Sequence, residues 1–561
     1  MRKRLRYFSP LLTVSIVLLA AAPVRAQDQP TAAVVSSSAP AQPVTPRQLP
    51  ASTTHGTVEV EGKPIQYTAI AGTLTVGATE EQDAMLGPDG NPLPGTATLP
   101  KDPANAPPTA QMFYVAYFKQ SADSSQRPIT FLYNGGPGSS TVWLHMGAFG
   151  PRRVSTPGDT HLPPAPYRLE NNAYSLLDAS DLVFIDMPGT GFGRLYGKDK
   201  EKAFWGVDQD GHAFARFIAR FLTHYNRWNS PKYLFGESYG TTRSAVLANL
   251  LENEKSIDLN GVILLSQVLN FEDLPDGPQG NPGNDLPYQI ELPTFAATAY
   301  YHHKLPQQPQ ALEQFLKEVE DFAMGDYARA LGQGDQLSAA DRQSIAEKLH
   351  TYTGLPVNYI LKANLRVTGG GFEKNLQADR NLTTGRLDSR FSGPTLDPLS
   401  EEAEYDPQSS AISSAYVSLF NQYARQTLQY GAGYSYLPEA IFGSHVWDLK
   451  HAQPGGPPAD LSSGTNVMPD LANAMKTNPR LKVMLNAGYY DLATPFYAAV
   501  YEEHHLPIER SLAANIQYAF YQSGHMVYVN DASLRQLHDN VAAFIRSTSG
   551  LSAAGSSAAG Q

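Results

Sequence analysis

The segment Gly236-Glu237-Ser238-Tyr239-Gly240 is the feature that most restricts the fold of this chain. It directly follows an apolar run at 233–235, and the residues from Thr241 to Leu251 carry apolar side chains at helical spacing. This succession predicts a strand, a tight turn and a helix, which is the context that gives G-x-S-x-G its meaning. The turn would strain the backbone of Ser238 and hold its hydroxyl clear of the sheet, and the flanking glycines avoid collisions with the neighbouring strand and helix. We interpret Ser238 as a candidate nucleophile; the alternative is an ordinary glycine-rich turn.

Two downstream segments supply candidate partners for that serine. Residues 481–488 form a short apolar strand that ends in glycine, and Asp491 follows within three residues. Residues 516–521 form another strand, and His525 follows it. The order Ser, Asp, His is that of an α/β-hydrolase triad, and each residue comes after a strand, where open α/β sheets place their sites. We therefore predict that Ser238, Asp491 and His525 are the catalytic residues.

An upstream turn completes the predicted site. The strand at 130–133 is followed by the glycine-rich segment from Asn134 to Ser140. A Gly-Gly turn after an early strand can aim a backbone N–H at the oxygen of a substrate carbonyl. Together with the N–H of the residue after the nucleophile it would form an oxyanion hole. We predict Gly136 and Tyr239 as the two donors.

The motifs together resemble those of the serine carboxypeptidase family, peptidase family S10. In chain order they are Asn134 to Ser140, Asp186 to Gly193, Gly236 to Gly240, Asp491 after a strand, and Gly524-His525-Met526-Val527. The resemblance spans roughly 400 residues and covers about 57–275 and 410–545. It implies a serine-type carboxypeptidase, which hydrolyses the C-terminal peptide bond of a peptide substrate through an acyl-enzyme on Ser238 and needs no cofactor.

The resemblance also implies a site for the substrate's terminal carboxylate. In the family this group is held by an Asn-Gly pair and two glutamic acids, and Asn134, Gly135 and Glu237 match three of these positions. The second acid is replaced by Ala148. A glutamic acid that faces a carboxylate must be protonated or share one proton with it, because adjacent carboxylates repel each other.

The replacement at Ala148 leaves two questions open. A cation could take the place of the acid, and Arg152, Arg153 or His145 could supply it, which would move the pH optimum toward neutral; the alternative is that these are solvated surface residues. The missing acid also favours a second function, an exported serine esterase or acyltransferase on the same triad. The retained Asn134, Gly135 and Glu237 oppose that alternative.

The fold predicted from the sequence is an α/β-hydrolase, with a mostly parallel central sheet and helices on both faces. An edge hairpin is expected near 56–76. Further strands are expected at 113–118, 129–134, 182–187, 232–236, 261–266, 482–487 and 516–521, and a helix at 206–228. The core comprises residues 55–271 and 409–546, and residues 272–408 between them are expected to form a largely helical cap. Within the cap, helical segments near 308–323, 326–332 and 338–350 are followed by a glycine-rich stretch at 369–371.

The two ends of the chain have a different composition. Basic residues at positions 2–6 precede an apolar stretch from Leu11 to Ala22, which predicts a secretory signal peptide over residues 1–26. Residues 27–54 are predicted to be a disordered linker rich in Pro, Ala and Ser, and residues 547–561 a flexible tail. The signal and the absence of cysteine favour export by a Gram-negative bacterium, to the periplasm or the medium.

Charge and composition restrict the partners. The formal charge is −11, and removal of residues 1–26 would make it more negative, which argues against nucleic acid as a partner. After signal removal we expect no stable membrane anchor, because no later segment reaches about 18 uninterrupted apolar residues. No His, Asp and Glu cluster has metal-ligand spacing, so we predict no metal. The oligomeric state and the preferred terminal residues do not follow from the sequence.

Overall fold

The computed structural model describes residues 49–95, 105–124, 126–456 and 464–550. The chain divides into two units, Met1–Val44 and Thr45–Gln561, and everything below concerns the second unit. The expected signal peptide and most of the expected linker lie outside the described residues.

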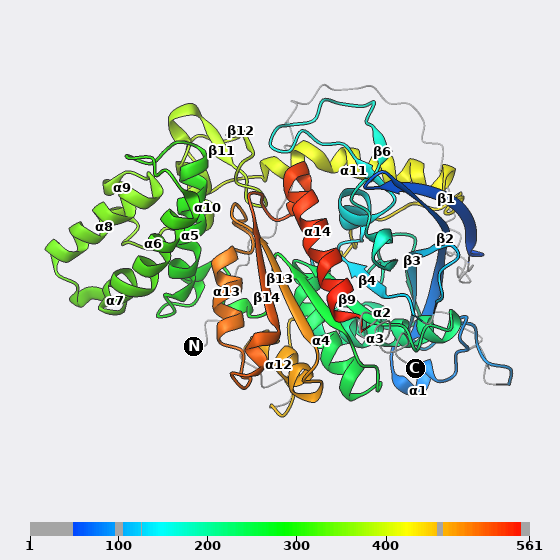
Figure 1. Cartoon of the computed structure of the whole chain (residues 1–561). Helices are drawn as coiled ribbons and strands as arrows, with labels where there is room; N and C mark the ends of the chain where they lie inside the picture. The colour runs from blue at the N-terminus through cyan, green and yellow to red at the C-terminus, as the bar shows by residue number, and fades with distance from the viewer. Residues whose placement is uncertain (1–48, 96–104, 125, 457–463, 551–561) are drawn as a thin grey trace, which may run out of the picture. The chain divides into compact units, whose positions relative to one another are not determined.

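A central sheet organises the described residues (Figure 1). Within them it has ten strands, nine in the order β1-β2-β3-β7-β4-β9-β10-β13-β14 and β8 paired with β3. The six strands from β7 to β14 in this order run parallel, and the remaining pairs are antiparallel. The bounds are β1 Ser52–Val60, β2 Lys63–Gly77, β3 Thr109–Lys119, β4 Ile129–Tyr133, β7 Asp181–Ile185, β8 Arg194–Tyr196, β9 Lys232–Glu237, β10 Gly261–Leu265, β13 Lys482–Gly488 and β14 Ile516–Tyr521. The predicted strands and the edge hairpin are all present, and the α/β-hydrolase fold is confirmed.

Helices cover both faces of this sheet. Successive strand residues contribute to two different cores, as the pleat of a strand buried on both sides requires. Phe131, for example, packs in the core that contains α3, α4 and α12, whereas Leu132 packs in the core that contains α11 and α14. The helices of the core are α1 Glu80–Asp83, α2 Lys200–Phe204, α3 Val207–His224, α4 Tyr239–Asn253, α11 Pro407–Gln426, α12 Met468–Thr477, α13 Phe496–His504 and α14 Asp531–Thr548.

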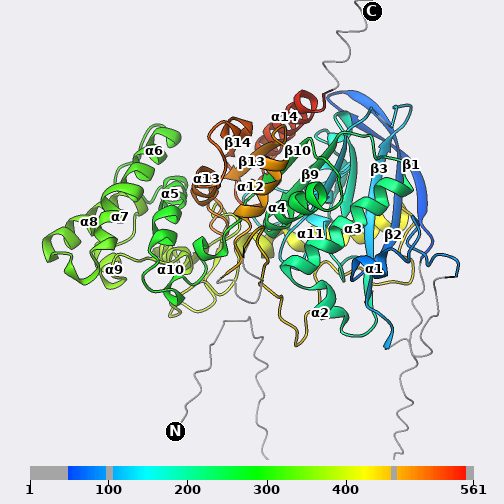
Figure 2. The same cartoon turned by 90° about the horizontal axis from the view of Figure 1, so that it is seen from below.

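A helical insertion, defined here as Leu286–Pro394, joins β10 to α11. Its elements are α5 Leu286–Tyr301, α6 Leu312–Phe322, α7 Ala328–Gly332, α8 Ala339–Thr353, α9 Val357–Lys362, α10 Gly369–Asn375, β11 Leu382–Thr384 and β12 Ser392–Pro394. These helices pack around a third hydrophobic core, and Tyr490 and Phe496 of the hydrolase core also contribute to it. Figures 1 and 2 show the insertion beside β14 and α13, at the opposite edge of the sheet from β1.

Three boundaries differ from those expected. The expected linker runs to residue 54, but Ser52–Thr54 already belong to β1 and pair with Ala71–Ala69, because the hairpin register continues to that point. The expected tail begins at 547, but α14 continues to Thr548. The insertion was expected to end at 408, but α11 begins at Pro407, where the Asp406 side chain caps it by accepting from the Ser409 N–H. The glycine-rich stretch 369–371, expected to follow the helical segments, itself forms the first turn of α10.

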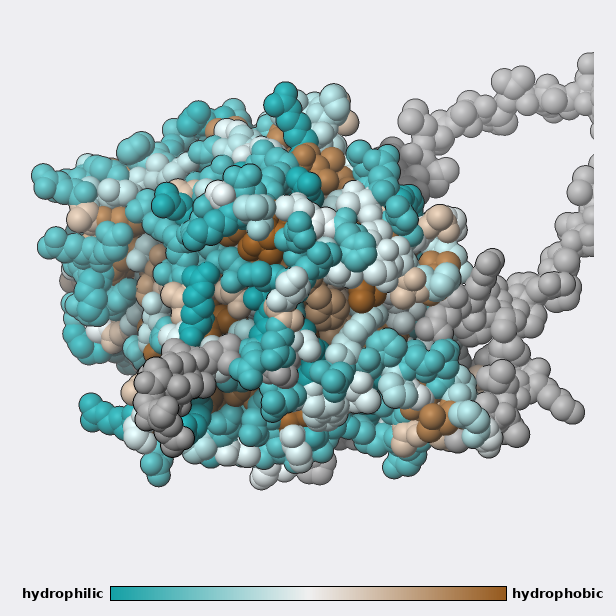
Figure 3. Space-filling model, turned by 45° about the vertical axis from the view of Figure 1, so that its right-hand side comes forward, coloured by the Kyte–Doolittle hydropathy of each residue, from teal (hydrophilic) through white to brown (hydrophobic). Residues whose placement is uncertain are grey.

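The described surface is largely polar. Figure 3 shows one face on which hydrophilic residues predominate and hydrophobic residues form small, separate patches. Within the described ranges, no helix combines the length and apolar character needed to cross a membrane.

A buried ion pair joins the two helices that pack against the nucleophile turn. The Arg243 guanidinium on α4 donates to Asp210 on α3 at 2.6 Å, and both side chains are completely buried. A second guanidinium N–H donates to the backbone oxygen of Asn134 at 2.7 Å. The ring of Phe214 lies 4.4 Å from the guanidinium carbon. Arg243 therefore links α3, α4 and the turn after β4.

We predict that Asp210→Ala lowers the free energy of unfolding by about 3 to 5 kcal/mol, because it leaves the Arg243 charge buried without its partner. Urea unfolding followed by circular dichroism measures the change. Asp321→Ala is the matched control: its partner Lys317 is largely exposed, and such a pair contributes about 0 to 1 kcal/mol. Equal stability of the two variants would contradict the prediction.

Candidate active site

Ser238 occupies the turn between β9 and α4 that the sequence predicts. Its φ of 61° and ψ of −131° lie in a region that non-glycine residues avoid, so the backbone is strained there. A Cβ on Gly236 would lie 2.1 Å from the backbone oxygen of Gly240, and a Cβ on Gly240 would lie 2.9 Å from that of Tyr133. Both glycines are therefore required by close backbone contacts.

Asp491 and His525 meet as predicted, although they lie on separate loops. Asp491 Oδ2 is 2.8 Å from His525 Nδ1. The fully buried Asp491 also accepts hydrogen bonds from the Ala493 and Thr494 N–H groups and from the Thr494 hydroxyl, at 2.9, 3.0 and 2.7 Å. The Thr494 hydroxyl lies 3.1 Å from the same ring nitrogen of His525. Thr494 is thus an additional support for the pair, which no sequence motif indicated.

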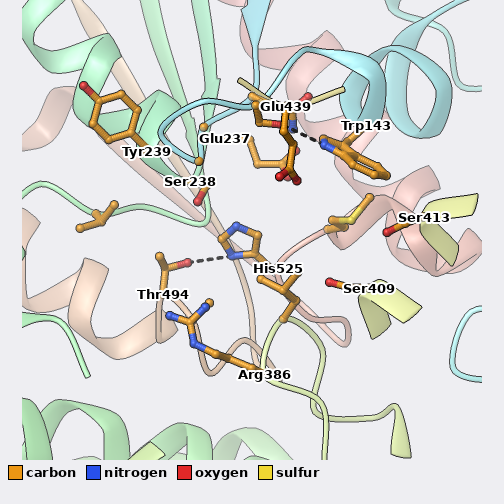
Figure 4. Close-up of a pocket in the computed structure, with 18 of the residues that line it drawn as sticks. Trp143, Glu237, Ser238, Tyr239, Arg386, Ser409, Ser413, Glu439, Thr494 and His525 are labelled. Atoms are coloured by element: carbon orange, nitrogen blue, oxygen red, sulfur yellow. Dashed lines mark hydrogen bonds between the residues drawn. The ribbon is translucent and has the colours of Figure 1, made fainter. Parts of the chain in front are cut away.

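Ser238 and His525 line one pocket, and Figure 4 shows the Ser238 side chain pointing toward the imidazole ring. A proton on Nδ1 donates to Asp491, which leaves the lone pair of Nε2 available as a base. Burial disfavours the charged imidazolium, but the charge and hydrogen bond of Asp491 and the nearby Glu237 outweigh it, so the pKa of His525 is raised above its ordinary value. The structure therefore brings the three predicted catalytic residues to one place.

The helical insertion holds the loop that carries His525. The backbone N–H of His525 donates to the Leu387 oxygen at 2.6 Å, and the Gly524 N–H donates to Asp388 at 3.2 Å. A Cβ on Gly524 would lie 2.5 Å from the Cα of Asp388, so the two backbones are in close contact. Arg390 forms an ion pair with Asp388 and also donates to the Ser523 hydroxyl.

The two predicted oxyanion donors lie on either side of a tight backbone contact. A Cβ on Gly135 would lie 2.4 Å from the backbone nitrogen of Tyr239, so the turn after β4 rests directly against the nucleophile turn. Gly136 has a φ of 110°, which glycine tolerates far better than other residues. Gly136 and Tyr239 both line the same pocket as Ser238.

Asp186, from the second motif, binds Thr141, the residue directly after the glycine-rich turn from Asn134 to Ser140. Its carboxylate accepts the Thr141 N–H at 2.7 Å and the Thr141 hydroxyl. Burial raises the pKa of Asp186 to about 6, against the lowering effect of these hydrogen bonds.

The predicted carboxylate-binding residues lie at the same pocket. Asn134, Gly135 and Glu237 line it, and its volume is about 500 Å³. Burial raises the pKa of Glu237 to about 7, while His525 and hydrogen bonds from Tyr528 and Asn134 lower it. The Asn134 side-chain oxygen accepts the Leu144 N–H at 3.0 Å, which fixes the amide.

Two of the three cations considered as replacements for the missing acid, His145 and Arg153, are engaged elsewhere. His145 is buried, desolvation lowers its pKa to about 3, and its Nε2 lies 2.7 Å from the Tyr117 hydroxyl. It is therefore neutral at ordinary pH. Arg153 is bound by Glu170 and Asp531, both at 2.7 Å. Neither His145 nor Arg153 is the solvated surface residue of the alternative interpretation, since both are buried.

The pocket contains a cation that sequence reasoning missed. Arg386, between β11 and β12 of the helical insertion, lines the pocket and donates to Asp276 at 2.6 Å. Figure 4 shows it on the side of His525 and Thr494, across the pocket from Glu237 and Trp143. The insertion has no family motif, so only the three-dimensional structure places Arg386 at the site.

The sheet order, the strained serine turn and the Asp–His pair define a serine hydrolase of the α/β-hydrolase fold. Residues 103–273 match the family model described as serine carboxypeptidase, Peptidase_S10. This stretch of the chain is therefore similar to the serine carboxypeptidase family.

Relatives and solved structures cover different shares of the chain. Serine carboxypeptidase-like 36 of Arabidopsis thaliana is 27% identical over 174 residues, which are 29% of this chain and 33% of the plant protein. The pheromone-processing carboxypeptidase KEX1 of Yarrowia lipolytica is 29% identical over 143 residues, 25% of this chain and 22% of that protein. The matches thus span a third or less of these relatives. The solved proline iminopeptidase of Mycobacterium smegmatis is 12% identical with a TM-score of 0.33, covering 78% of this chain and 96% of that chain.

We predict that Ser238→Ala abolishes hydrolysis of a small aryl ester, with a loss of about 10⁴-fold or more in kcat, because the acyl-enzyme cannot form. In parallel, a fluorophosphonate probe should label the wild-type protein and not the variant, with the modified peptide identified by mass spectrometry. Ser266→Ala is the matched control, since Ser266 is a nearby buried serine whose hydroxyl donates to the His525 backbone oxygen. Labelling of Ser238→Ala at another serine would contradict the assignment.

Proposed function

We propose that this protein is a serine-type carboxypeptidase, which hydrolyses the C-terminal peptide bond of peptides through an acyl-enzyme on Ser238. The observation that carries the proposal is a buried acid, Glu237, placed directly before the candidate nucleophile and within the same pocket. An esterase needs no buried acid there, whereas a peptidase that reads a free C-terminus needs a group to share a proton with the terminal carboxylate.

The proposed reaction uses the geometry described above. His525 takes the proton of Ser238 as the hydroxyl oxygen attacks the carbonyl carbon, and Asp491 stabilises the resulting imidazolium. The N–H groups of Gly136 and Tyr239 bind the oxyanion, where loss of one donor typically costs about 100- to 1000-fold. His525 then gives the proton to the leaving amine. Water, activated by the same base, releases the acyl group.

The carboxylate site would confine the reaction to the last residue. Asn134 and Gly135 would donate hydrogen bonds to the terminal carboxylate, and protonated Glu237 would donate a third. Arg152, Arg153 and His145 have no part in the proposal, because the second and third of these are engaged or neutral and none of the three lines the pocket in the described chain.

Two titrations with opposite signs set the proposed pH dependence. Glu237 must be protonated to bind a terminal carboxylate, and its pKa is raised to about 7, so binding is intact below that pH and is lost as the pH rises through it. His525 must be neutral to act as a base, and its pKa is also raised, so turnover is lost as the pH falls through that value. The two groups interact, so the profile reports the pair.

We also propose that the protein is exported to the periplasm or the medium. The basic and apolar pattern of residues 1–26 supports this, and N-terminal sequencing of the protein from the culture would test it by showing whether the chain starts after Ala26.

We predict that the enzyme releases the last residue from a peptide with a free C-terminus and cleaves the matched C-terminal amide at least about 100-fold more slowly, because the amide cannot share the proton of Glu237. Mass spectrometry of both digests between pH 4 and 8 measures this. Equal cleavage of the two peptides would remove the carboxypeptidase proposal. Hydrolysis of a small ester without cleavage of either peptide would move the protein to the esterase or acyltransferase class.

We predict further that the KM for the free peptide rises about tenfold per pH unit above pH 7 in the wild type. In Glu237→Gln the KM should stay nearly constant over the same range, because the amide donates a hydrogen bond at every pH. Steady-state kinetics from pH 5 to 9 checks both. A wild-type KM that does not change with pH would show that Glu237 does not titrate on binding.

A further inference from the structure

A tyrosine ring packs against the backbone of the residue before Ala148. Ala148 is fully buried in the turn Leu144–Phe149, at the position where the family resemblance implies a second acid. A Cβ on the preceding Gly147 would lie 2.6 Å from the Cδ2 and Cε2 atoms of Tyr528. The Tyr528 ring therefore packs against the Gly147 backbone, one residue before Ala148.

The hydroxyl of Tyr528 reaches the carboxylate site. It donates to Glu237 Oε2 at 2.9 Å. Tyr528 is 1% exposed and stands three residues after His525, in the turn Val527–Val529. Burial and the nearby Glu237 raise the pKa of the phenol well above its ordinary value. It therefore stays protonated throughout the working range and donates a hydrogen bond to Glu237, a bond that is stronger when the carboxyl of Glu237 is ionised.

The groups that face Glu237 come from several elements. His525 lowers its pKa and Asp491 raises it, from the loops after β14 and β13. Asn134 and Tyr528 lower it by hydrogen bonding. Burial and the charge of Glu237 raise the pKa of Tyr416 on α11. Among these neighbours Tyr528 is the phenol with a direct hydrogen bond to the carboxylate, and its removal would change the titration of Glu237 without removing a charge.

We propose that Tyr528 is a positioning residue of the terminal carboxylate site, where its hydroxyl takes the place of a second acid and orients Glu237 toward the substrate. The proposal rests on the carboxypeptidase function proposed above. A site with two acids facing a substrate carboxylate contains three carboxyl groups and binds best with two protons. With a phenol in place of one acid, a single proton suffices. The site would then bind a free C-terminal carboxylate at a higher pH than a two-acid site can.

The experiment compares Tyr528→Phe with the wild type. The substitution keeps the ring packing against Gly147 and removes only the hydroxyl. Because that hydroxyl stabilises the ionised form of Glu237, its loss should move the midpoint of the KM rise upward by about one pH unit. Between pH 5 and 9 the wild-type plot of log KM against pH should have a limiting slope of one.

Tyr233→Phe is the matched control. Tyr233 is another buried tyrosine, on the same strand as Glu237, and its hydroxyl bonds the Ile545 oxygen and Thr548. It should leave the midpoint in place, although it removes a comparable hydrogen bond. In a Glu237→Gln background, Tyr528→Phe should produce no pH-dependent change at all.

The outcomes separate the two proposals. An unchanged midpoint in Tyr528→Phe, or a limiting slope of two in the wild type, would overturn the role of Tyr528 while the carboxypeptidase function stands. Equal shifts in Tyr528→Phe and Tyr233→Phe would overturn it too, since the effect would then be a general loss of packing. Failure of the wild type to distinguish a free from an amidated peptide would instead overturn the proposed function itself.

Discussion

The close approach of two backbone turns is the constraint on which the site depends. The turn at Ser238 and the turn after β4 touch at Gly135, where no side chain fits against the Tyr239 nitrogen. This contact places the candidate oxyanion donors next to the candidate nucleophile before any substrate arrives. It also explains why Arg243 is buried beneath both turns: a guanidinium has enough donors to bind Asp210 and the Asn134 oxygen at once. The strain at Ser238 is therefore offset by neighbouring contacts, as strained sites require.

Charge within the pocket is governed by burial. Glu237, His525 and Asp491 are buried close together. The charges of Asp491 and Glu237 raise the pKa of His525, and the charge of His525 lowers the pKa of Glu237. Asp491 accepts hydrogen bonds from Ala493 and Thr494. Burial raises the pKa of Glu237 to about 7. The same group of buried side chains can thus contain a neutral His525 for catalysis and a protonated Glu237 for binding at similar pH.

The elements of the hydrolase core and the candidate triad were predictable, because each is encoded in a short stretch of sequence. The strand–turn–helix around Ser238 and the strands before Asp491 and His525 carry their own periodicity and glycines. Contacts between distant segments were not predictable in the same way. Arg386 and Thr494 carry no local signal, and Tyr528 follows the motif at 524–527 without a predicted role. The start of β1 at Ser52 depends on pairing with residues near Ala71, which no composition rule reports.

The attachment of the His525 loop to Leu387 and Asp388 has a consequence for the order in which the chain becomes a working enzyme. The general base is aligned by a segment that folds around a separate hydrophobic core. If the sheet formed before the insertion, the molecule would have the strained Ser238 turn, but the His525 imidazole would not be held in place beside it. Hydrolytic activity would then require a folded insertion, so a partly folded molecule would hold the serine without a working base.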